Sequence, residues 1–141
     1  MPTILVPFDG SEPALRAVEY AAKLAKAGDN HAIVVLNVQA PAPSFWPEKL
    51  VNEDMLRAHY ASEGAKTLEA AERRLREVGV PFRSEVRAGL AGDTIAEFAR
   101  DERVDSIMMG TRGMGAVGSL VMGSVAQKVV HLTALPVTLV K

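Results

Sequence analysis

Short runs of branched apolar residues alternate with longer helical patterns along this chain of 141 residues. A short continuous apolar run is typical of a strand that is buried on both faces, as in parallel sheets covered by helices. Alternation of such strands with helices indicates an α/β domain, in which right-handed crossovers place helices on both faces of the sheet. The five expected strands lie at residues 3–8, 31–38, 81–87, 104–109 and 136–140.

Local signals place the helices between these strands. Ser11 is a candidate N-cap for the first helix. A long helical stretch is expected at 47–78, ended by Gly79. Asp93 is expected to cap a short third helix, and the last helix is first placed at about 119–132. The third strand is more polar than the others, which favours a position near an edge of the sheet.

Charge and cysteine content exclude several classes of function. Sixteen Lys and Arg are balanced by seventeen Asp and Glu, so the net charge of −1 supplies no field that would draw the protein to nucleic acid or to an anionic membrane. The absence of cysteine excludes disulfide scaffolds, zinc–thiolate sites and iron–sulfur clusters. His31, His59 and His131 are not spaced as metal ligands on one helix, so no metal site is expected.

Length and the opening residues bear on organisation and location. A chain of this size is expected to form one domain, over residues 1–141. No apolar run approaches the ~18 residues that would span a membrane. The first ten residues lack the basic segment and long apolar core of a signal peptide. The expected location is therefore the cytoplasm.

The segment after the fourth strand is unusually rich in glycine. Residues 110–123 read GTRGMGAVGSLVMG and contain five of the eleven glycines. In an open parallel sheet, ligands bind beyond the carboxyl ends of the strands, which is where this segment begins. Glycine lets a ligand approach the backbone, and N–H groups that lead into a helix N-terminus form a phosphate site. The segment is therefore the strongest candidate for a ligand site.

Three phosphate motifs compete for this segment. Residues 113–118 match GxGxxG, but they follow the fourth strand, and no acidic residue lies about 20 positions further on to hold a ribose. Residues 118–124 resemble a P-loop without its lysine. The third match is Gly110 and Gly113, nine further residues, and then Gly123 and Ser124, which is the pattern G-x2-G-x9-G-[S/T].

With this third motif, the chain resembles the universal stress protein family over its whole length. The opening ILVPFDGSEPALRAVEYAAKLA is similar to the family's first strand, Asp-Gly-Ser turn and first helix. VDSIMMGTRG is similar to its fourth strand and turn, and MGSVAQKVVHLTALPVTLVK to its last helix and strand. The resemblance implies a Rossmann-like sheet of five parallel strands in the order 3-2-1-4-5. It also implies binding of ATP, with or without Mg²⁺, since family members that carry the motif are the ATP binders.

The resemblance also implies particular binding residues. Asp9 would lie near the ribose, Val38 would line the adenine pocket, and residues 123–125 would hold phosphates. A phosphate site of this kind lies at a helix start, so the last helix is expected to begin at Gly123 rather than at 119. The complete implied set is Pro7, Asp9, Val38, Met109, Gly110, Arg112, Gly113, Gly123, Ser124 and Val125.

Purely structural interpretations remain open at several of these positions. Either Asp9 or Ser11 could cap the first helix, and Ser124 could be a plain N-cap of the last one. Arg112 could be a solvated loop charge. Met109, at the end of its strand, could belong to the core.

The leading hypothesis is a nucleotide-binding module of stress response or signalling, with slow or no ATP hydrolysis. Phosphoryl transfer needs positioned positive charge and an oriented nucleophile, which the motif does not supply. The alternative is an ATP-hydrolysing or nucleotidyl-transferring α/β enzyme, although its usual phosphate loop after the first strand is missing. A third hypothesis is a partner-binding domain without a ligand, against which the intact glycines count. The sequence does not identify protein partners.

The last strand is expected at an edge of the sheet and to pair with a second copy of the chain. An apolar edge strand exposes unpaired backbone groups unless something covers it. Antiparallel pairing about a two-fold axis would cover both copies. The resemblance implies the same homodimer, with Val137 and Leu139, or alternatively Thr138 and Val140, at the interface.

Overall fold

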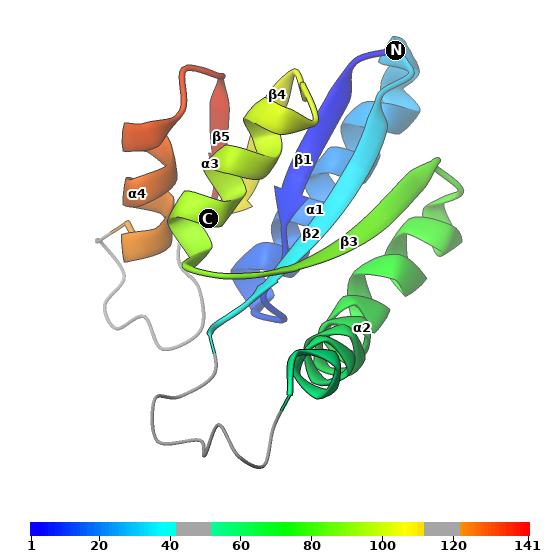
Figure 1. Ribbon diagram of the computed structural model, residues 1–141. Helices are drawn as coiled ribbons and strands as arrows, with labels where there is room; N and C mark the ends of the chain where they lie inside the picture. The colour runs from blue at the N-terminus through cyan, green and yellow to red at the C-terminus, as the bar shows by residue number, and fades with distance from the viewer. Residues whose placement is uncertain (42–51, 112–121) are drawn as a thin grey trace.

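Five parallel strands form a sheet in the order β3-β2-β1-β4-β5 (Figure 1). This computed structural model describes residues 1–41, 52–111 and 122–141. The order and the parallel pairing confirm the fold expected from the sequence. The elements are β1 Thr3–Pro7, α1 Glu12–Leu24, the π-helical η1 Ala25–Asp29, β2 Ala32–Gln39, α2 Glu53–Val78, β3 Phe82–Ala88, α3 Ala91–Asp101, β4 Ser106–Gly110, α4 Ser124–Leu132 and β5 Val137–Val140.

Helices cover both faces of the sheet, and each face has its own apolar core. Side chains alternate between the faces along a strand, so Val35 of β2 packs with α1 and α2 while its neighbour Leu36 packs with α3 and α4. Figure 1 shows α3 and α4 on the near side of the sheet and α1 on the far side. This double burial explains why the inner strands are continuous apolar runs in the sequence.

The helix ends confirm some of the local predictions. The Ser11 side chain accepts a hydrogen bond from the Ala14 N–H, so Ser11 is the N-cap of α1. Gly79 ends α2 with a φ of 81°, a left-handed conformation that glycine adopts without strain. The polar third strand, β3, is indeed at an edge of the sheet.

Other helix starts differ from the sequence-based expectation. α3 begins at Ala91 after Leu90, so Asp93 lies within its first turn and does not cap it. There the Asp93 carboxylate lies 4.0 Å from the Lys128 ammonium of α4. Its negative charge still interacts favourably with the positive end of the α3 dipole, although it does not cap the helix. α2 begins at Glu53 with Asn52 as its cap, rather than near residue 47. α4 begins at Ser124 with Gly123 as its N-cap, one residue after the start expected at Gly123; residues 119–121 of the first placement lie outside the described residues.

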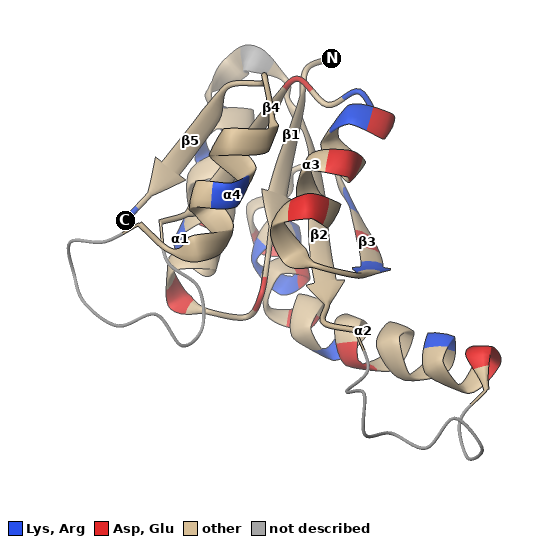
Figure 2. Ribbon diagram, turned by 60° about the vertical axis from the view of Figure 1, so that its left-hand side comes forward, with Lys and Arg blue, Asp and Glu red and all other residues tan. Residues whose placement is uncertain are grey.

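Charges of both signs are interspersed on the helices. Figure 2 shows acidic and basic residues following one another along α2, whereas α3 carries three acidic residues and one arginine. Arg74 of α2, for example, pairs with Glu19 of α1 at 3.1 Å and with Glu77 at 3.2 Å. Such mixing agrees with the net charge of −1 and leaves α2 without a field of one sign.

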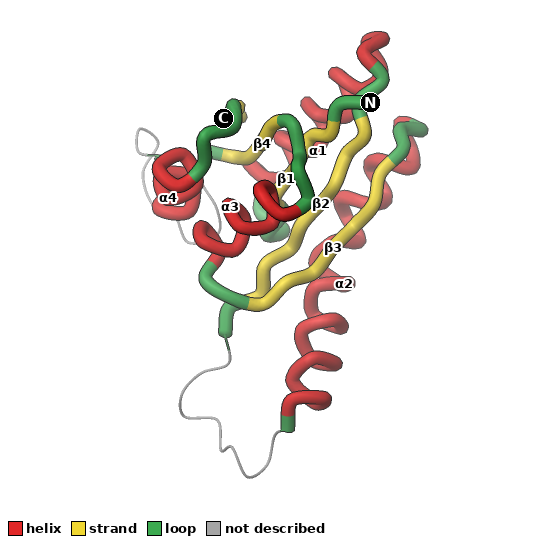
Figure 3. The backbone as a smooth tube through the Cα atoms, turned by 45° about the horizontal axis from the view of Figure 1, so that its top comes forward, coloured by secondary structure: helices red, strands yellow, loops and turns green. Residues whose placement is uncertain are grey.

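The long helix α2 extends past the sheet. Its buried residues begin only at Gly64, although the helix starts at Glu53. Figure 3 shows the first turns of α2 continuing beyond the ends of β2 and β3. These turns lie on the side of the carboxyl ends of the strands, where ligands bind in parallel sheets.

Candidate nucleotide site at the carboxyl ends of the strands

Strands β1 and β4 are neighbours whose following helices cover opposite faces of the sheet. α1 follows β1 and packs in one core, while α4, the next described element after β4, packs in the other. Connections that leave two adjacent strands in opposite directions create the crevice in which α/β proteins bind ligands. The carboxyl ends of β1 and β4 therefore mark the candidate site.

The turn after β1 is fixed by local hydrogen bonds. The Asp9 carboxylate accepts a hydrogen bond from the Ser11 N–H at 2.9 Å, and Ser11 in turn caps α1. Gly10 has a φ of +88°, which favours glycine. Pro7, directly before this turn, is buried, whereas Asp9 is exposed. Of the two cap candidates, Ser11 is the cap, and Asp9 holds the turn ahead of it.

Val38 and Met109 pack toward the same side of the sheet. Met109 is buried in the core covered by α3 and α4, and the half-buried Val38 packs against that core. Each lies near the carboxyl end of its strand, in β2 and β4 respectively. Their apolar surface lies on the face that α4 covers.

Gly110 ends β4 against the first turn of α1. A Cβ at this position would lie 2.8 Å from the carbonyl carbon and from the Cβ of Pro13, and 3.0 Å from the nitrogen of Ala14. These distances are shorter than an ordinary contact of ~3.5–4.0 Å between carbon atoms. The contact with α1 is therefore sufficient by itself to require glycine at the first position of the motif.

The described residues on either side of the glycine-rich segment are hydrogen-bonded to each other. The Gly123 N–H donates to the Thr111 carbonyl at 2.5 Å, and the Thr111 N–H donates to the Val140 carbonyl at 3.0 Å. The Gln127 side chain donates to the Met122 carbonyl at 3.1 Å. These bonds hold the start of α4 beside the end of β4. Arg112 and Gly113, two residues of the implied site, lie outside the described residues.

Among the residues that the structure describes, no side chain caps the N-terminus of α4. Gly123 occupies the N-cap position, and Ser124, which could have been a plain N-cap, is instead the first helical residue. Both Ser124 and Val125 are exposed. The first N–H groups of a helix lack partners within the helix and carry its positive dipole end. This helix start can therefore hold an anion such as a phosphate.

The sequence pattern gave no role to Asn37, which lies deep in the same region. It is 3% exposed, and its side-chain amide donates to the Phe8 carbonyl at 2.9 Å. A polar residue inside the apolar run of β2 was the only available signal. Its partner, 29 residues away, emerges only from the fold.

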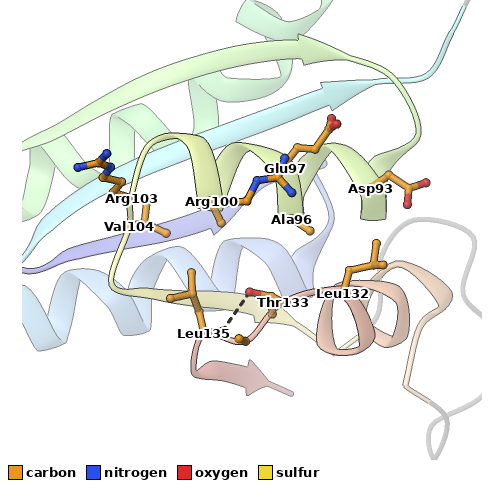
Figure 4. A pocket seen from close by; sticks show the side chains of 11 residues that line it. Asp93, Ala96, Glu97, Arg100, Arg103, Val104, Leu132, Thr133 and Leu135 are labelled. Carbon is orange, nitrogen blue, oxygen red and sulfur yellow. Dashed lines mark hydrogen bonds between the residues drawn. The ribbon is translucent and has the colours of Figure 1, made fainter.

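A cavity of about 590 Å³ lies elsewhere, along α3 and the residues that follow α4 (Figure 4). Leu132 and Leu135 line it together with the charged Glu97 and Arg100. None of the implied site residues that the structure describes lines this cavity. Figure 4 shows Leu135 directed toward α3, on the outside of the sheet.

Neither a membrane span nor a metal-binding cluster is present in the described ranges 1–41, 52–111 and 122–141. No helix there is both long enough and apolar enough to cross a bilayer. Within the same residues, no group of three or more His, Asp or Glu side chains is placed to bind one metal ion.

Comparison with known proteins gives a consistent result. A model described as the universal stress protein family matches residues 1–141. A universal stress protein of Thermus aquaticus is 38% identical over 140 residues, which cover 99% of this chain and 98% of that protein. Among solved structures, the protein MJ0577 superposes with a TM-score of 0.85 at 27% identity, over 99% of this chain and 95% of that one.

Two further structural neighbours contain nucleotides. A universal stress protein in complex with cAMP has a TM-score of 0.72 at 22% identity, covering 99% of this chain and 95% of its own. The universal stress protein of Archaeoglobus fulgidus in complex with dAMP has a TM-score of 0.67 at 22% identity, covering 100% of this chain and 98% of its own. At this level of identity the two neighbours establish the shared fold.

Proposed function

The chain belongs to the universal stress protein family, and from this premise we propose that it is an adenine-nucleotide-binding module of a stress response, with slow or no hydrolysis. The proposed ligand is ATP, alone or with Mg²⁺. The observation that carries the proposal is the N-terminus of α4, which no side chain of the described residues caps and which lies beside the end of β4. The nucleotides cAMP and dAMP in two neighbours support the ligand class.

The proposed binding residues divide by the part of the nucleotide they meet. Gly123, Ser124 and Val125 would bind phosphates through the backbone N–H groups of α4 and the Ser124 hydroxyl. Asp9 would accept a hydrogen bond from the ribose, and Val38 would contact the adenine. Pro7 would lie at the adenosine together with Asp9. The wall around the first phosphate and the ribose would consist of Met109, Gly110, Arg112 and Gly113.

The composition of this site favours binding over turnover. Of the proposed residues that the structure describes, Asp9 alone is ionisable, and its carboxylate already accepts from the Ser11 N–H. Phosphoryl transfer requires positioned cations and an oriented nucleophile. A site built mainly from backbone N–H groups supplies affinity for phosphate but no proton transfer.

Calorimetric titration with ATP, ADP and AMP, with and without Mg²⁺, tests the ligand directly. Replacement of Ser124 by Asp tests where the phosphates lie. An acidic side chain in the first turn of a helix is stabilising by about 0.3–1 kcal/mol, so the Ser124→Asp variant should be at least as stable as the wild type. The same charge would repel phosphate, so ATP binding should be lost.

The neutral variant Ser124→Asn is the matched control, because it has nearly the same size without the charge. It should retain ATP binding within roughly tenfold, the effect of one hydrogen bond. Wild-type affinity in the Ser124→Asp variant would exclude the start of α4 as the phosphate site. Absence of ATP binding by the wild-type protein would refute the proposed function itself.

We also propose that the protein is cytoplasmic and that two copies of the chain form a dimer by pairing their β5 strands. β5 is an edge strand of the sheet. Val137 and Leu139 pack against the chain's own core, while Thr138 is exposed. The Ile107 N–H donates to the Pro136 carbonyl, and the Thr111 N–H donates to the Val140 carbonyl. The backbone groups of the even-numbered residues along β5 therefore point toward β4. By the alternation of a parallel ladder, the backbone groups of Val137 and Leu139 point to the open edge.

A further inference from the structure

Asn37 is the one buried polar residue among the residues that the structure describes, at 3% exposure. It lies in β2, two residues after Val35, and therefore on the same face of the strand. Every other buried side chain of this core is apolar. A buried amide needs hydrogen-bond partners to offset the loss of water, so its contacts indicate what it does.

Those contacts hold the residue that precedes Asp9. The Phe8 N–H donates to the Leu36 carbonyl at 2.8 Å, and the Phe8 carbonyl accepts from the Asn37 side chain at 2.9 Å. Both backbone groups of Phe8 are thus bound to β2, one by backbone and one by a side chain. The chain leaves β1 for the turn at Asp9 from a fixed position.

The same amide is itself held from its other side. The Gln39 side chain donates to the Asn37 Oδ1 at 2.6 Å, and the Gln39 carbonyl accepts from the Gly89 N–H at 2.9 Å. Hydrogen bonds therefore connect the carboxyl ends of β3, β2 and β1 in one line that ends at Phe8. An asparagine amide can donate and accept at once, which neither leucine nor an ionised aspartate can do.

We propose that Asn37 is the positioning residue of the nucleotide site, which acts by setting the place of Asp9 through the Phe8 carbonyl. The inference rests on the proposed function and assigns a role to a residue that does not contact the ligand. If Asn37 acts only through Asp9, its removal has no further effect on affinity once the Asp9 carboxylate is gone. A merely structural role would weaken binding whether or not that carboxylate is present.

A double-mutant cycle separates these two roles. ATP affinity is measured by calorimetry for the wild type, Asn37→Leu, Asp9→Ala and the double variant. Asn37→Leu keeps the branched shape of the side chain, with a somewhat larger volume, and removes the donor, and it should weaken ATP binding roughly tenfold. The double variant should bind within about twofold of Asp9→Ala alone, whereas independent effects would multiply.

Val35→Ala is the matched control on the same strand and face. It opens a cavity in the same core and removes neither hydrogen bond of Phe8, which go to Leu36 and Asn37, so it should lower the melting temperature and leave ATP affinity unchanged. If Asn37→Leu does not fold, Gln39→Leu carries the cycle instead, because it withdraws only the donor to the Asn37 Oδ1; the expected loss is then about fivefold.

Two results would overturn the inference alone while ATP binding persists: wild-type affinity in Asn37→Leu, or losses that multiply in the double variant. Absence of ATP binding by the wild-type protein would overturn the proposed function and this inference with it.

Discussion

Replacement of Gly110 by alanine should destabilise the protein by overpacking, in the absence of any nucleotide. The added Cβ would lie 2.8 Å from two atoms of Pro13 and 3.0 Å from the Ala14 nitrogen. The first two distances fall short of a carbon–carbon contact by ~0.7–1.2 Å. The carbonyl carbon of Pro13 and the Ala14 nitrogen are backbone atoms of α1, so rotation of a side chain cannot relieve the overlap.

The magnitude follows from what has to move. Gly110 does not have a positive φ, so alanine meets no backbone strain; by restricting the unfolded chain, alanine would by itself stabilise the protein by about 0.4–1 kcal/mol. Either β4 or the first turn of α1 must shift, and overpacking of this kind costs about 1–3 kcal/mol. Set against the gain from the unfolded chain, a net loss of about 1–2 kcal/mol remains. With a slope of ~2 kcal/mol per molar urea, the midpoint of unfolding should fall by ~0.5–1 M at unchanged slope.

Urea unfolding followed by circular dichroism, on nucleotide-free protein, measures this effect. If Gly110 serves only the approach of a phosphate, the variant should unfold like the wild type under these conditions. A loss below ~0.5 kcal/mol, the usual scatter for harmless substitutions, would refute the packing argument.

Three further predictions concern other parts of the structure. Ser11→Ala should lower stability by about 0.5–2 kcal/mol through loss of the α1 cap, while Asp9→Ala should weaken ATP binding by roughly 10–100-fold with a smaller change in melting temperature. Thermal melting and calorimetry are measured on both variants, and the prediction fails if Asp9→Ala mainly lowers the melting temperature and Ser11→Ala mainly weakens ATP binding. Val137→Pro should convert a dimer into a monomer in analytical ultracentrifugation, because it removes an outward N–H without breaking the ladder to β4, and an exposed substitution on α4, Val130→Lys, serves as the control that should stay dimeric. Gly79→Ala should cost about 1 kcal/mol in urea unfolding, since its φ of 81° disfavours alanine; unchanged stability would mean that the end of α2 can relax.

The local patterns were sufficient for the element types and for several of their ends. Continuous apolar runs predict buried strands, because helices cover both faces of each inner strand. Ser11 and Gly79 act on backbone groups within a few residues of their own positions, so short-range chemistry predicted both. The same reasoning wrongly predicted Asp93 as the cap of α3. The first helical bond of α3 runs from the Thr94 N–H to the Leu90 carbonyl, which places the helix start ahead of the capping residue type.

The glycine-rich motif and the resemblance it carries also came from the sequence, including the strand order and the implied binding residues. What only the tertiary structure decided was which residues meet across the carboxyl ends of the strands. The first turn of α1 leaves no room for a side chain at Gly110, and the Asn37 side chain, on another strand, donates a hydrogen bond to Phe8. Neither contact leaves a periodic trace, because periodicity records which face a residue lies on, whereas a contact between distant segments depends on how the elements are placed against one another.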